Sequence, residues 1–224
     1  MIIDETKVPS LEKEKGLFIA IEGIDGSGKS THIKYIAKMI KEKYNKEVIE
    51  TREPGGTPMA EKLRTLVLAK GEEHISADAE VLLFNAARCI HVENLIKPSV
   101  EAGKVVVSDR FCDSTFAYQC AHGADYDRIK KLTDWTLKGF VPDYTFFFFI
   151  SPEVAKSRVD NRKTKDRFDE ETDDKNFVEK TAAIFIRRMN EGKGKYVIID
   201  SSKSVENTQM QIDQILEHIF TNKE

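Results

Sequence analysis

The chain has 224 residues, a formal net charge of −3 at pH 7, 33% charged residues and 40% hydrophobic residues. This length allows one sizeable domain with its own core, and the nearly balanced charge gives no general attraction to nucleic acid or anionic lipid. The sequence has no apolar run of about 18 residues, as a membrane-spanning helix needs, and its three cysteines (Cys89, Cys112 and Cys120) lack paired zinc-site spacing, so we expect a reducing, cytoplasmic setting.

Residues 1–15 form an arm with seven charged side chains. A secretory signal peptide needs an uninterrupted apolar segment, so we expect a loose or docked arm instead. The folded domain is expected to occupy residues 16–224.

The first predicted strand, Leu17–Ile21, leads directly into Gly23-x-x-x-x-Gly28-Lys29-Ser30, and apolar residues then recur at helical spacing over Lys29–Tyr44. Glycines in such a loop let backbone N–H groups surround a phosphate, Lys29 reaches the outer phosphates, and Ser30 offers a hydroxyl to Mg²⁺. The order strand, loop, helix favours a nucleoside triphosphate site over a glycine-rich turn without a ligand.

The second predicted strand, Glu47–Thr51, is followed by Arg52-Glu53-Pro54-Gly55-Gly56-Thr57 and by a predicted helix over Pro58–Ala69. Open parallel sheets place ligand-binding loops after the carboxyl ends of their strands. Pro-Gly-Gly also fits an ordinary turn, so the pattern alone leaves both interpretations open.

A long helix is predicted over Ala77–Ala102, and it places Phe84 and Arg88 four residues apart on one face. Phe84 is suited to stack on a nucleotide base while Arg88 donates to the carbonyl of that base. By pattern alone, a phenylalanine at such a position is more often a core residue.

The third predicted strand, Lys104–Ser108, ends in Asp109-Arg110. An aspartate there suits Mg²⁺ or its water, and an arginine suits bidentate contact with a phosphate. Without the preceding loop motif, an ordinary ion pair at a strand end is equally consistent.

The remaining sequence predicts two more strands, Tyr144–Ile150 and Tyr196–Ile199, and helices over Ser114–Gln119, Tyr126–Lys138, Pro152–Arg162, Asp174–Asn190 and Val205–Phe220. The four consecutive aromatics Phe146–Phe149 favour a central strand buried on both faces over a ligand-binding box. Strands that alternate with helices predict an α/β fold: a P-loop NTPase of three layers, with a five-stranded parallel sheet flanked by helices.

A basic segment stands out between the last two strands. Arg158, Arg162, Lys163, Lys165 and Arg167 lie within ten residues, and Asp169-Glu170-Glu171 follows. Mixed charge of this kind is usually a solvated surface. In a P-loop protein it also suits a lid whose cations fold over the triphosphate, and the pattern does not separate the two.

Five segments in this order together resemble the thymidylate kinase family, and the resemblance covers nearly the whole chain after the arm: Glu22-Gly23-Ile24-Asp25-Gly26-Ser27-Gly28-Lys29-Ser30-Thr31, Thr51-Arg52-Glu53-Pro54-Gly55-Gly56-Thr57, Phe84-Asn85-Ala86-Ala87-Arg88, Asp109-Arg110-Phe111 and Asp166-Arg167-Phe168. In that family ATP donates its γ-phosphoryl group to dTMP, giving dTDP and ADP with Mg²⁺, in dTTP biosynthesis. The resemblance further implies a homodimer and a short mobile lid at about residues 153–173.

The resemblance assigns roles residue by residue. ATP would contact Gly23, Gly26, Ser27, Gly28, Lys29, Ser30 and Thr31, and the metal would lie near Ser30 and Asp109. The dTMP site would comprise Asp25, Glu53, Pro54, Arg64, Phe84, Arg88, Arg110, Thr115, Tyr118 and Gln119. Catalysis would depend on Asp25, Lys29, Arg110, Arg158 and Arg162.

Within that assignment, Asp25 holds the deoxyribose 3′-hydroxyl, Arg110 and Arg64 bind the monophosphate, and Tyr118 crowds the sugar 2′ position. Some family members carry an arginine inside the P-loop where this chain has Gly26, so the lid must supply that cation, with Arg158 and Arg162 as the candidates. Enzymes of bacterial type have this arrangement.

Three departures from the family pattern concern details. After Gln119 the family usually has a glycine and a Gly-Arg-Gly-like turn, whereas this chain reads Cys120-Ala121-His122-Gly123-Ala124, so no arginine role is carried over there. Phe111 stands where Tyr or His is usual, and Phe149 replaces an acidic residue often found near the end of the fourth strand. Two rival functions remain: a P-loop kinase for another small acceptor, and a nucleotide-dependent switch. The switch would need an Asn-Lys-x-Asp segment, and the sequence contains none.

Overall fold

The computed structural model describes residues 15–69, 74–160, 175–192 and 194–221. The predicted arm, except for Lys15, lies outside the described residues. Most of the expected lid does as well, including Arg162, so only the part of the lid up to residue 160 is placed.

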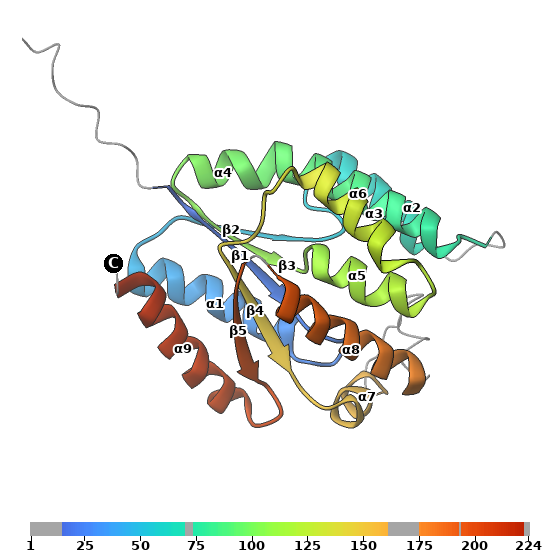
Figure 1. The fold of residues 1–224 in the computed structure, drawn as a ribbon. Helices are drawn as coiled ribbons and strands as arrows, with labels where there is room; N and C mark the ends of the chain where they lie inside the picture. Colours follow the sequence, from blue (N-terminus) through green and yellow to red (C-terminus); the bar gives the residue numbers. More distant parts are fainter. Residues whose placement is uncertain (1–14, 70–73, 161–174, 193, 222–224) are drawn as a thin grey trace, which may run out of the picture.

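A single parallel sheet forms the middle of the molecule (Figure 1). Its strands are β1 (Leu17–Glu22), β2 (Val48–Arg52), β3 (Val105–Asp109), β4 (Tyr144–Phe149) and β5 (Lys195–Asp200), in the order β2-β3-β1-β4-β5. All four neighbouring pairs are parallel, which confirms the predicted α/β class with five parallel strands. Because the strands run the same way, the loops that follow β1, β2 and β3 meet at one edge of the sheet.

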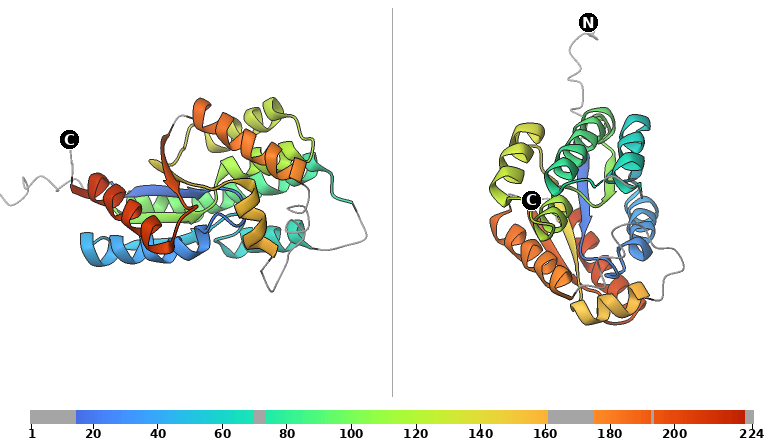
Figure 2. Two further views of the ribbon diagram at one scale, coloured as in Figure 1. Left: turned by 90° about the horizontal axis from the view of Figure 1, so that it is seen from below. Right: turned by 90° about the vertical axis from the view of Figure 1, so that its right-hand side faces the viewer.

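Helices cover both faces of the sheet, giving three layers (Figure 2). The helices are α1 (Lys29–Tyr44), α2 (Pro58–Leu68), α3 (Ala77–His91), α4 (Lys97–Glu101), α5 (Cys112–Ala121), α6 (Tyr126–Leu137), α7 (Pro152–Asp160), α8 (Lys175–Glu191) and α9 (Val205–Thr221), with a π-helical turn η2 (Val92–Ile96). Helices α1 and α9 lie on one face, while the α3 to α6 segment and α8 lie on the other.

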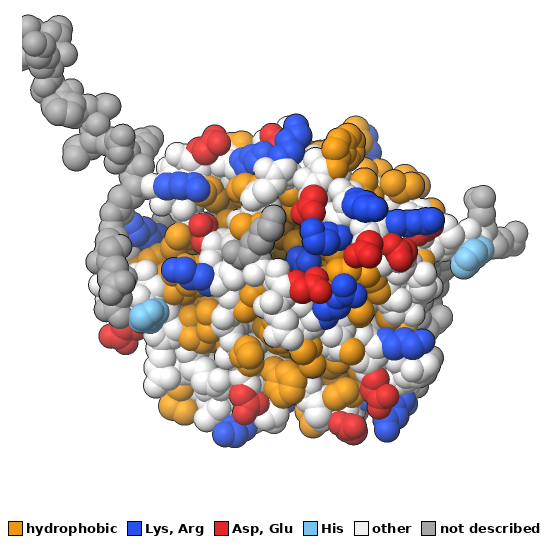
Figure 3. All heavy atoms as spheres, in the orientation of Figure 1, with side chains coloured by type: hydrophobic (Ala, Val, Ile, Leu, Met, Phe, Trp, Pro, Cys, Tyr) orange, Lys and Arg blue, Asp and Glu red, His pale blue; other side chains and the backbone are white. Residues whose placement is uncertain are grey.

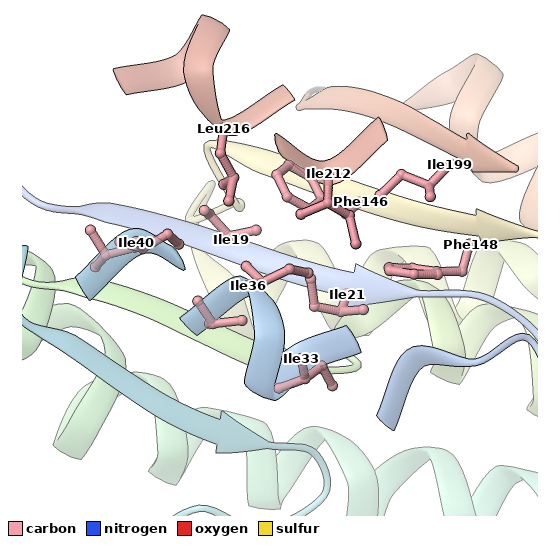
Figure 4. Packing of buried hydrophobic residues seen from close by; sticks show 12 residues of the cluster. Ile19, Ile21, Ile33, Ile36, Ile40, Phe146, Phe148, Ile199, Ile212 and Leu216 are labelled. Carbon is pink, nitrogen blue, oxygen red and sulfur yellow. The ribbon is translucent and has the colours of Figure 1, made fainter. Parts of the chain in front are cut away.

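The central strand β1 is apolar on both sides, as a strand between two helical layers must be. Ile19 and Ile21 pack with residues of α1 and α9 (Figure 4), while Phe18 and Ala20 pack on the opposite side with the η2 and α4 segment. The alternation of side chains along a strand therefore fills two separate cores. Together these cores fix the position of the loop that leaves β1.

The prediction of a fully buried aromatic strand is wrong at one residue. Phe146, Phe147 and Phe148 are buried, but Phe149 is 48% exposed. Phe149 is the last residue of β4, at the edge where the chain leaves the sheet toward α7. The strand itself is an inner one, as predicted, because it pairs with β1 on one side and β5 on the other.

The long helix predicted over Ala77–Ala102 is not a regular α-helix throughout. After α3 the chain forms the π turn η2, in which the N–H of Lys97 donates to the carbonyl of Val92, and α4 follows. Pro98 has no N–H to donate, and the π turn immediately precedes it, as is typical of local adjustments in a helix that carries proline. The other elements agree with their predicted bounds within two residues, and α5 extends two residues to either side of Ser114–Gln119. The predicted end of the α7 helix, Arg162, lies outside the described residues.

The surface carries both signs of charge. On the face shown in Figure 3, Lys and Arg side chains alternate with Asp and Glu side chains. Among the helices of the described residues, none combines the length and apolarity needed to cross a bilayer.

Candidate functional site

The loop between β1 and α1 has the backbone shape that its sequence predicts. Ser27 is fully buried within the loop, while Ser30 and Thr31 are exposed in the first turn of α1. Three loop glycines have positive φ angles, which other residues rarely adopt: Gly23 (142°), Gly26 (80°) and Gly28 (89°). The predicted ATP residues therefore share one loop and the positive end of the helix that follows.

Lys29 is buried at the centre of this loop. Its Nζ donates to the carbonyls of Gly23 at 2.8 Å and Ile24 at 2.9 Å. Burial, reinforced by the positive charge of Arg110, lowers the pKa of Lys29 to about 8. Anionic phosphate oxygens beside this ammonium group would favour its charged form.

Helix α7 packs against the loop backbone at Gly26. A Cβ atom added at Gly26 would lie 2.4 Å from the carbonyl oxygen of Ala155. Arg158 of α7 donates from Nη1 to the carbonyl of Gly26 at 3.3 Å and from Nη2 to the carbonyl of Ser201 at 2.9 Å. The structure thus brings the predicted cation Arg158 to the phosphate-binding loop and leaves no room there for an arginine in place of Gly26.

A pocket of about 170 Å³ opens beside the phosphate-binding loop, at the carboxyl edge of the sheet. All ten residues predicted for the acceptor nucleotide line it: Asp25, Glu53, Pro54, Arg64, Phe84, Arg88, Arg110, Thr115, Tyr118 and Gln119. Five further residues complete its lining: Arg52, Leu68, Asp109, Phe111 and Ser114. Residues far apart in the sequence therefore converge on one cavity.

Arg110 and Asp25 connect this pocket to the phosphate-binding loop. Nη2 of Arg110 lies 2.5 Å from Oδ1 of Asp25, and the hydroxyl of Tyr118 donates to Oδ2 of Asp25 at 2.8 Å. Burial raises the pKa of the Tyr118 phenol, which stays protonated and able to donate. Burial opposes the charge of Arg110, but the carboxylate of Asp25 raises the pKa of Arg110 above its ordinary value, so this residue remains a cation.

Arg88 is the centre of a buried polar network on the other side of the pocket. Its Nε donates to Oε2 of Glu53 at 2.6 Å, and its Nη2 donates to Oγ1 of Thr115 at 2.8 Å and to the carbonyl of Phe111 at 3.2 Å. Arg88 is only 2% exposed, and its Nη1 has no hydrogen-bond partner among the residues that the structure describes. Buried donors are nearly always satisfied, so Nη1 is available for a ligand atom.

The remaining base-pocket candidates differ in their surroundings. Phe84 is half-buried and lines the cavity, so it is not simply a core residue. Gln119 is buried, and its Nε2 donates to Oε2 of Glu80 at 3.1 Å. Arg64 donates from Nη1 to the carbonyl of Pro54 at 2.8 Å, so it supports the loop after β2.

The predicted metal residues supply oxygen atoms of the kind that Mg²⁺ prefers. Asp109 ends β3, lines the pocket and has a buried Oδ1 that no group in the described part of the chain contacts by a hydrogen bond, while Ser30 is exposed at the start of α1. Within the described part of the chain, no group of three or more His, Cys, Asp or Glu side chains is arranged to hold a metal ion.

Two buried residues that were not identified from the sequence have side chains that hold parts of the site in place. His91 is fully buried and bridges Oε1 of Glu53 at 3.0 Å to Oγ1 of Thr51 at 2.7 Å. Glu22 is buried under α5. Glu22 begins the first motif segment and His91 follows the Phe84–Arg88 segment, but neither position says what the side chain contacts.

Comparisons with known proteins agree with this geometry. The thymidylate kinase family model matches residues 21–212, which is most of the chain. The chain belongs to the thymidylate kinase family. Similar curated thymidylate kinases include one from Chromobacterium violaceum, 40% identical over 212 residues that cover 94% of this chain and 98% of that protein. Another, from Ruthia magnifica, is 42% identical over 206 residues, covering 91% of this chain and 98% of that protein.

Membership of the thymidylate kinase family confirms the resemblance drawn from the five motif segments. A relative from Hahella chejuensis is 41% identical over 202 residues, which cover 90% of this chain and 96% of that thymidylate kinase. The similarity therefore extends across the phosphate-binding loop, the pocket and the α7 segment together.

Proposed function

We propose that this protein transfers the γ-phosphoryl group of ATP to dTMP, giving ADP and dTDP, and so serves dTTP synthesis in the cytoplasm. The observation that carries the proposal is the convergence of the ten acceptor candidates on one pocket that touches the phosphate-binding loop through Asp25. A loop that binds ATP and also contacts the acceptor pocket holds both substrates in one geometry, which is the main requirement for this kind of transfer.

On the donor side, backbone N–H groups of the loop and the Lys29 ammonium bind the phosphates of ATP. Mg²⁺, held by Ser30 and Asp109, would neutralise charge on the phosphates. Arg158 reaches the loop from α7 and supplies a further cation. These groups stabilise the negative charge of the transferred phosphoryl group.

On the acceptor side, Arg110 binds the monophosphate and Asp25 accepts from the 3′-hydroxyl of the sugar. Arg88 donates from Nη1 to a carbonyl of thymine, and Phe84 stacks on the ring. The attacking phosphate oxygen is already anionic at neutral pH, so no general base is required. Catalysis consists of alignment and charge neutralisation.

Tyr118 gives the pocket a means of excluding ribonucleotides. Its hydroxyl is fixed by the carboxylate of Asp25 at 2.8 Å, and its ring is buried. With Asp25 on the 3′-hydroxyl, the Tyr118 side chain occupies the space where a 2′-hydroxyl would lie. We expect dTMP to be preferred to its ribonucleotide counterpart.

We also propose that the protein acts as a homodimer. Helices α2 and α3 pack together, and they expose Met59 (53%), Leu66 (60%) and Leu82 (60%). Exposed apolar side chains on two packed helices suit contact with a second copy of the chain. Light scattering on the eluted protein should give twice the monomer mass, and Leu66→Asp combined with Leu82→Asp should lower it.

The experiment that tests the function is ADP formation from MgATP with dTMP, dUMP, the ribonucleotide of thymine, dGMP or thymidine offered separately. Strong stimulation by dTMP above the others supports the proposal. Stimulation by another acceptor would overturn the base-pocket roles, and stimulation by none would favour a nucleotide-dependent switch.

A further inference from the structure

Glu22, the last residue of β1, has its carboxylate buried against the start of α5. It is 1% exposed. Its Oε1 accepts from the backbone N–H of Phe111 at 2.8 Å and of Ser114 at 3.1 Å, and its Oε2 accepts from the hydroxyl of Ser114 at 2.6 Å. A buried carboxylate is costly unless its oxygens are satisfied, and three donors satisfy this one.

These contacts make Glu22 the cap of a helix to which it does not belong. The N-cap residue of α5, Phe111, makes no side-chain capping bond, so the first N–H groups of α5 need another acceptor. Glu22 supplies that acceptor, and its negative charge lies at the positive end of the helix. Helix α5 carries Ser114, Thr115, Tyr118 and Gln119 into the acceptor pocket.

The backbone of Arg110 also depends on this carboxylate. Arg110 has a φ of 70°, which is uncommon for a residue other than glycine and needs support from its surroundings. The N–H of Arg110 donates to the carbonyl of Ile21 at 2.9 Å, and its carbonyl accepts from the hydroxyl of Ser108 at 2.8 Å. The next N–H, that of Phe111, is the one held by Glu22.

The side chain of Arg110 is held through Ser114. Nη1 of Arg110 donates a hydrogen bond to Oγ of Ser114 at 2.8 Å, and the same hydroxyl donates a hydrogen bond to Oε2 of Glu22. Nη1 also donates to the carbonyl of Gly23 at 3.3 Å. One nitrogen of the guanidinium is therefore anchored by protein groups, while Nη2 faces Asp25 and Tyr118 in the pocket.

A second acidic residue, Asp113, lies beside this arrangement without taking its place. Its Oδ1 accepts from Nε of Arg188 at 2.8 Å, and its Oδ2 accepts from the hydroxyl of Tyr196 at 2.6 Å. The charge of Asp113 is thus compensated by α8 and β5. Glu22 is the carboxylate whose hydrogen bonds lead to Arg110.

We propose that Glu22, acting through the hydroxyl of Ser114, is a positioning residue that orients Arg110 toward the monophosphate group of the acceptor nucleotide. This inference rests on the proposed function, because it takes Arg110 as the phosphate-binding residue. It separates two parts of acceptor recognition: Glu22 and Ser114 act on the phosphate, whereas Arg88 and Phe84 act on the base.

The test compares binding of dTMP with binding of thymidine, which lacks the phosphate, by titration calorimetry. Ser114→Ala should weaken dTMP binding about tenfold or more, the usual cost of a lost hydrogen bond to a charged group, and should leave thymidine binding within about twofold. Ser114→Thr, which keeps the hydroxyl, should restore most of the dTMP affinity. Glu22→Gln should act in the same direction as Ser114→Ala.

Ser76→Ala is the matched control, because Ser76 is an exposed N-cap whose Oγ accepts from the N–H of Ala79 at 3.3 Å. It removes a helix cap that has no connection to Arg110 and should change neither affinity. The inference is overturned if Ser114→Ala leaves dTMP binding unchanged, or weakens dTMP and thymidine by the same factor. Failure of the proposed function gives a different result, since the wild-type protein would then show no ADP formation that depends on dTMP.

Discussion

Replacing Arg88 by lysine tests the base pocket, because it keeps the charge and removes the planar fork of donors. In the structure, three atoms accept from Arg88, namely Oε2 of Glu53, Oγ1 of Thr115 and the carbonyl of Phe111. A lysine ammonium is a single point on an unbranched stem and cannot serve these acceptors and a ligand together. Arg88→Lys therefore loses the donor that Nη1 offers to the base.

The expected magnitude follows from the number of lost bonds. One hydrogen bond to a charged group contributes about 1.5–3 kcal/mol, so dTMP affinity should fall between about tenfold and about 150-fold. The fold should survive, because the Glu53 carboxylate keeps a cationic partner. Arg88→Ala would remove the cation beside that buried carboxylate and leave it with the His91 ring as a partner, and should cost about 3–5 kcal/mol of unfolding free energy.

Titration calorimetry with dTMP and urea unfolding measure the two effects separately. Arg187→Lys is the control, because Arg187 is an exposed arginine that pairs with Glu191 on the same helix, away from the pocket. Its dTMP affinity should equal that of the wild-type protein. An Arg88→Lys variant that binds dTMP within twofold of wild type would refute the role given to Nη1.

Four further substitutions test the rest of the site. Asp25→Ala should lower kcat/KM by about 100-fold at a nearly unchanged melting temperature, because the acceptor loses its alignment; near-normal turnover in a folded variant would contradict this. Gly26→Arg should reduce the unfolding free energy measured in urea by about 1–3 kcal/mol, because the new side chain would collide with the carbonyl of Ala155 and the backbone there has a φ of 80°. Unchanged stability would show that α7 moves aside. Arg158→Ala should lower kcat about tenfold or more with little effect on dTMP binding, and equal kcat would assign Arg158 a structural part only. Burial, with the nearby charge of Asp113, raises the pKa of Glu22 from 4.5 to about 7. The folded state thus binds this proton more tightly than the unfolded chain, and the resulting stability is lost as the pH rises through about 7. Urea unfolding of wild type and of Glu22→Gln should be measured between about pH 5 and about pH 8. Over this range the unfolding free energy of the wild type should fall relative to that of the variant, by at most about 3 kcal/mol. If the difference between the two proteins does not change with pH, the pKa of Glu22 is not raised.

The architecture could be predicted from sequence because each strand carries a continuous apolar run and each helix an apolar stripe. The bounds of α1 are as predicted, since a glycine begins it and Asn45 ends it with a left-handed conformation. The exposure of Phe149 and the π turn at Val92–Ile96 could not be predicted. Both depend on tertiary surroundings. The exposure of Phe149 depends on where the helices that pack on the sheet end, and the π turn depends on how the packed helical segment accommodates Pro98.

The candidate site likewise has residues that the sequence could predict and residues that it could not. Residues within motifs, such as Asp25 and Arg110, have a spacing that indicates their place at the carboxyl edge of the sheet. The residues beneath them do not, because the partners of Glu22 are 89 and 92 positions away in the chain. Local pattern carries no information about a pairing across such a distance, and only the packing of α5 on β1 creates it.

The π turn has a consequence for the geometry of the α3 to α4 rod. A turn closed by a bond from Lys97 to Val92 contains one residue more than an α-helical turn, and one residue corresponds to about 100° of rotation about the helix axis. The residues that follow it are therefore rotated about the axis, relative to those that precede it, from where an unbroken α-helix would place them: Arg88 lies in the acceptor pocket, and Val100 packs in the core with Phe18 and Val106. Shortening the segment by one residue would preserve a continuous helix and yet misalign one of these two faces, so the length of this rod is as much a determinant of the pocket as the residues that line it.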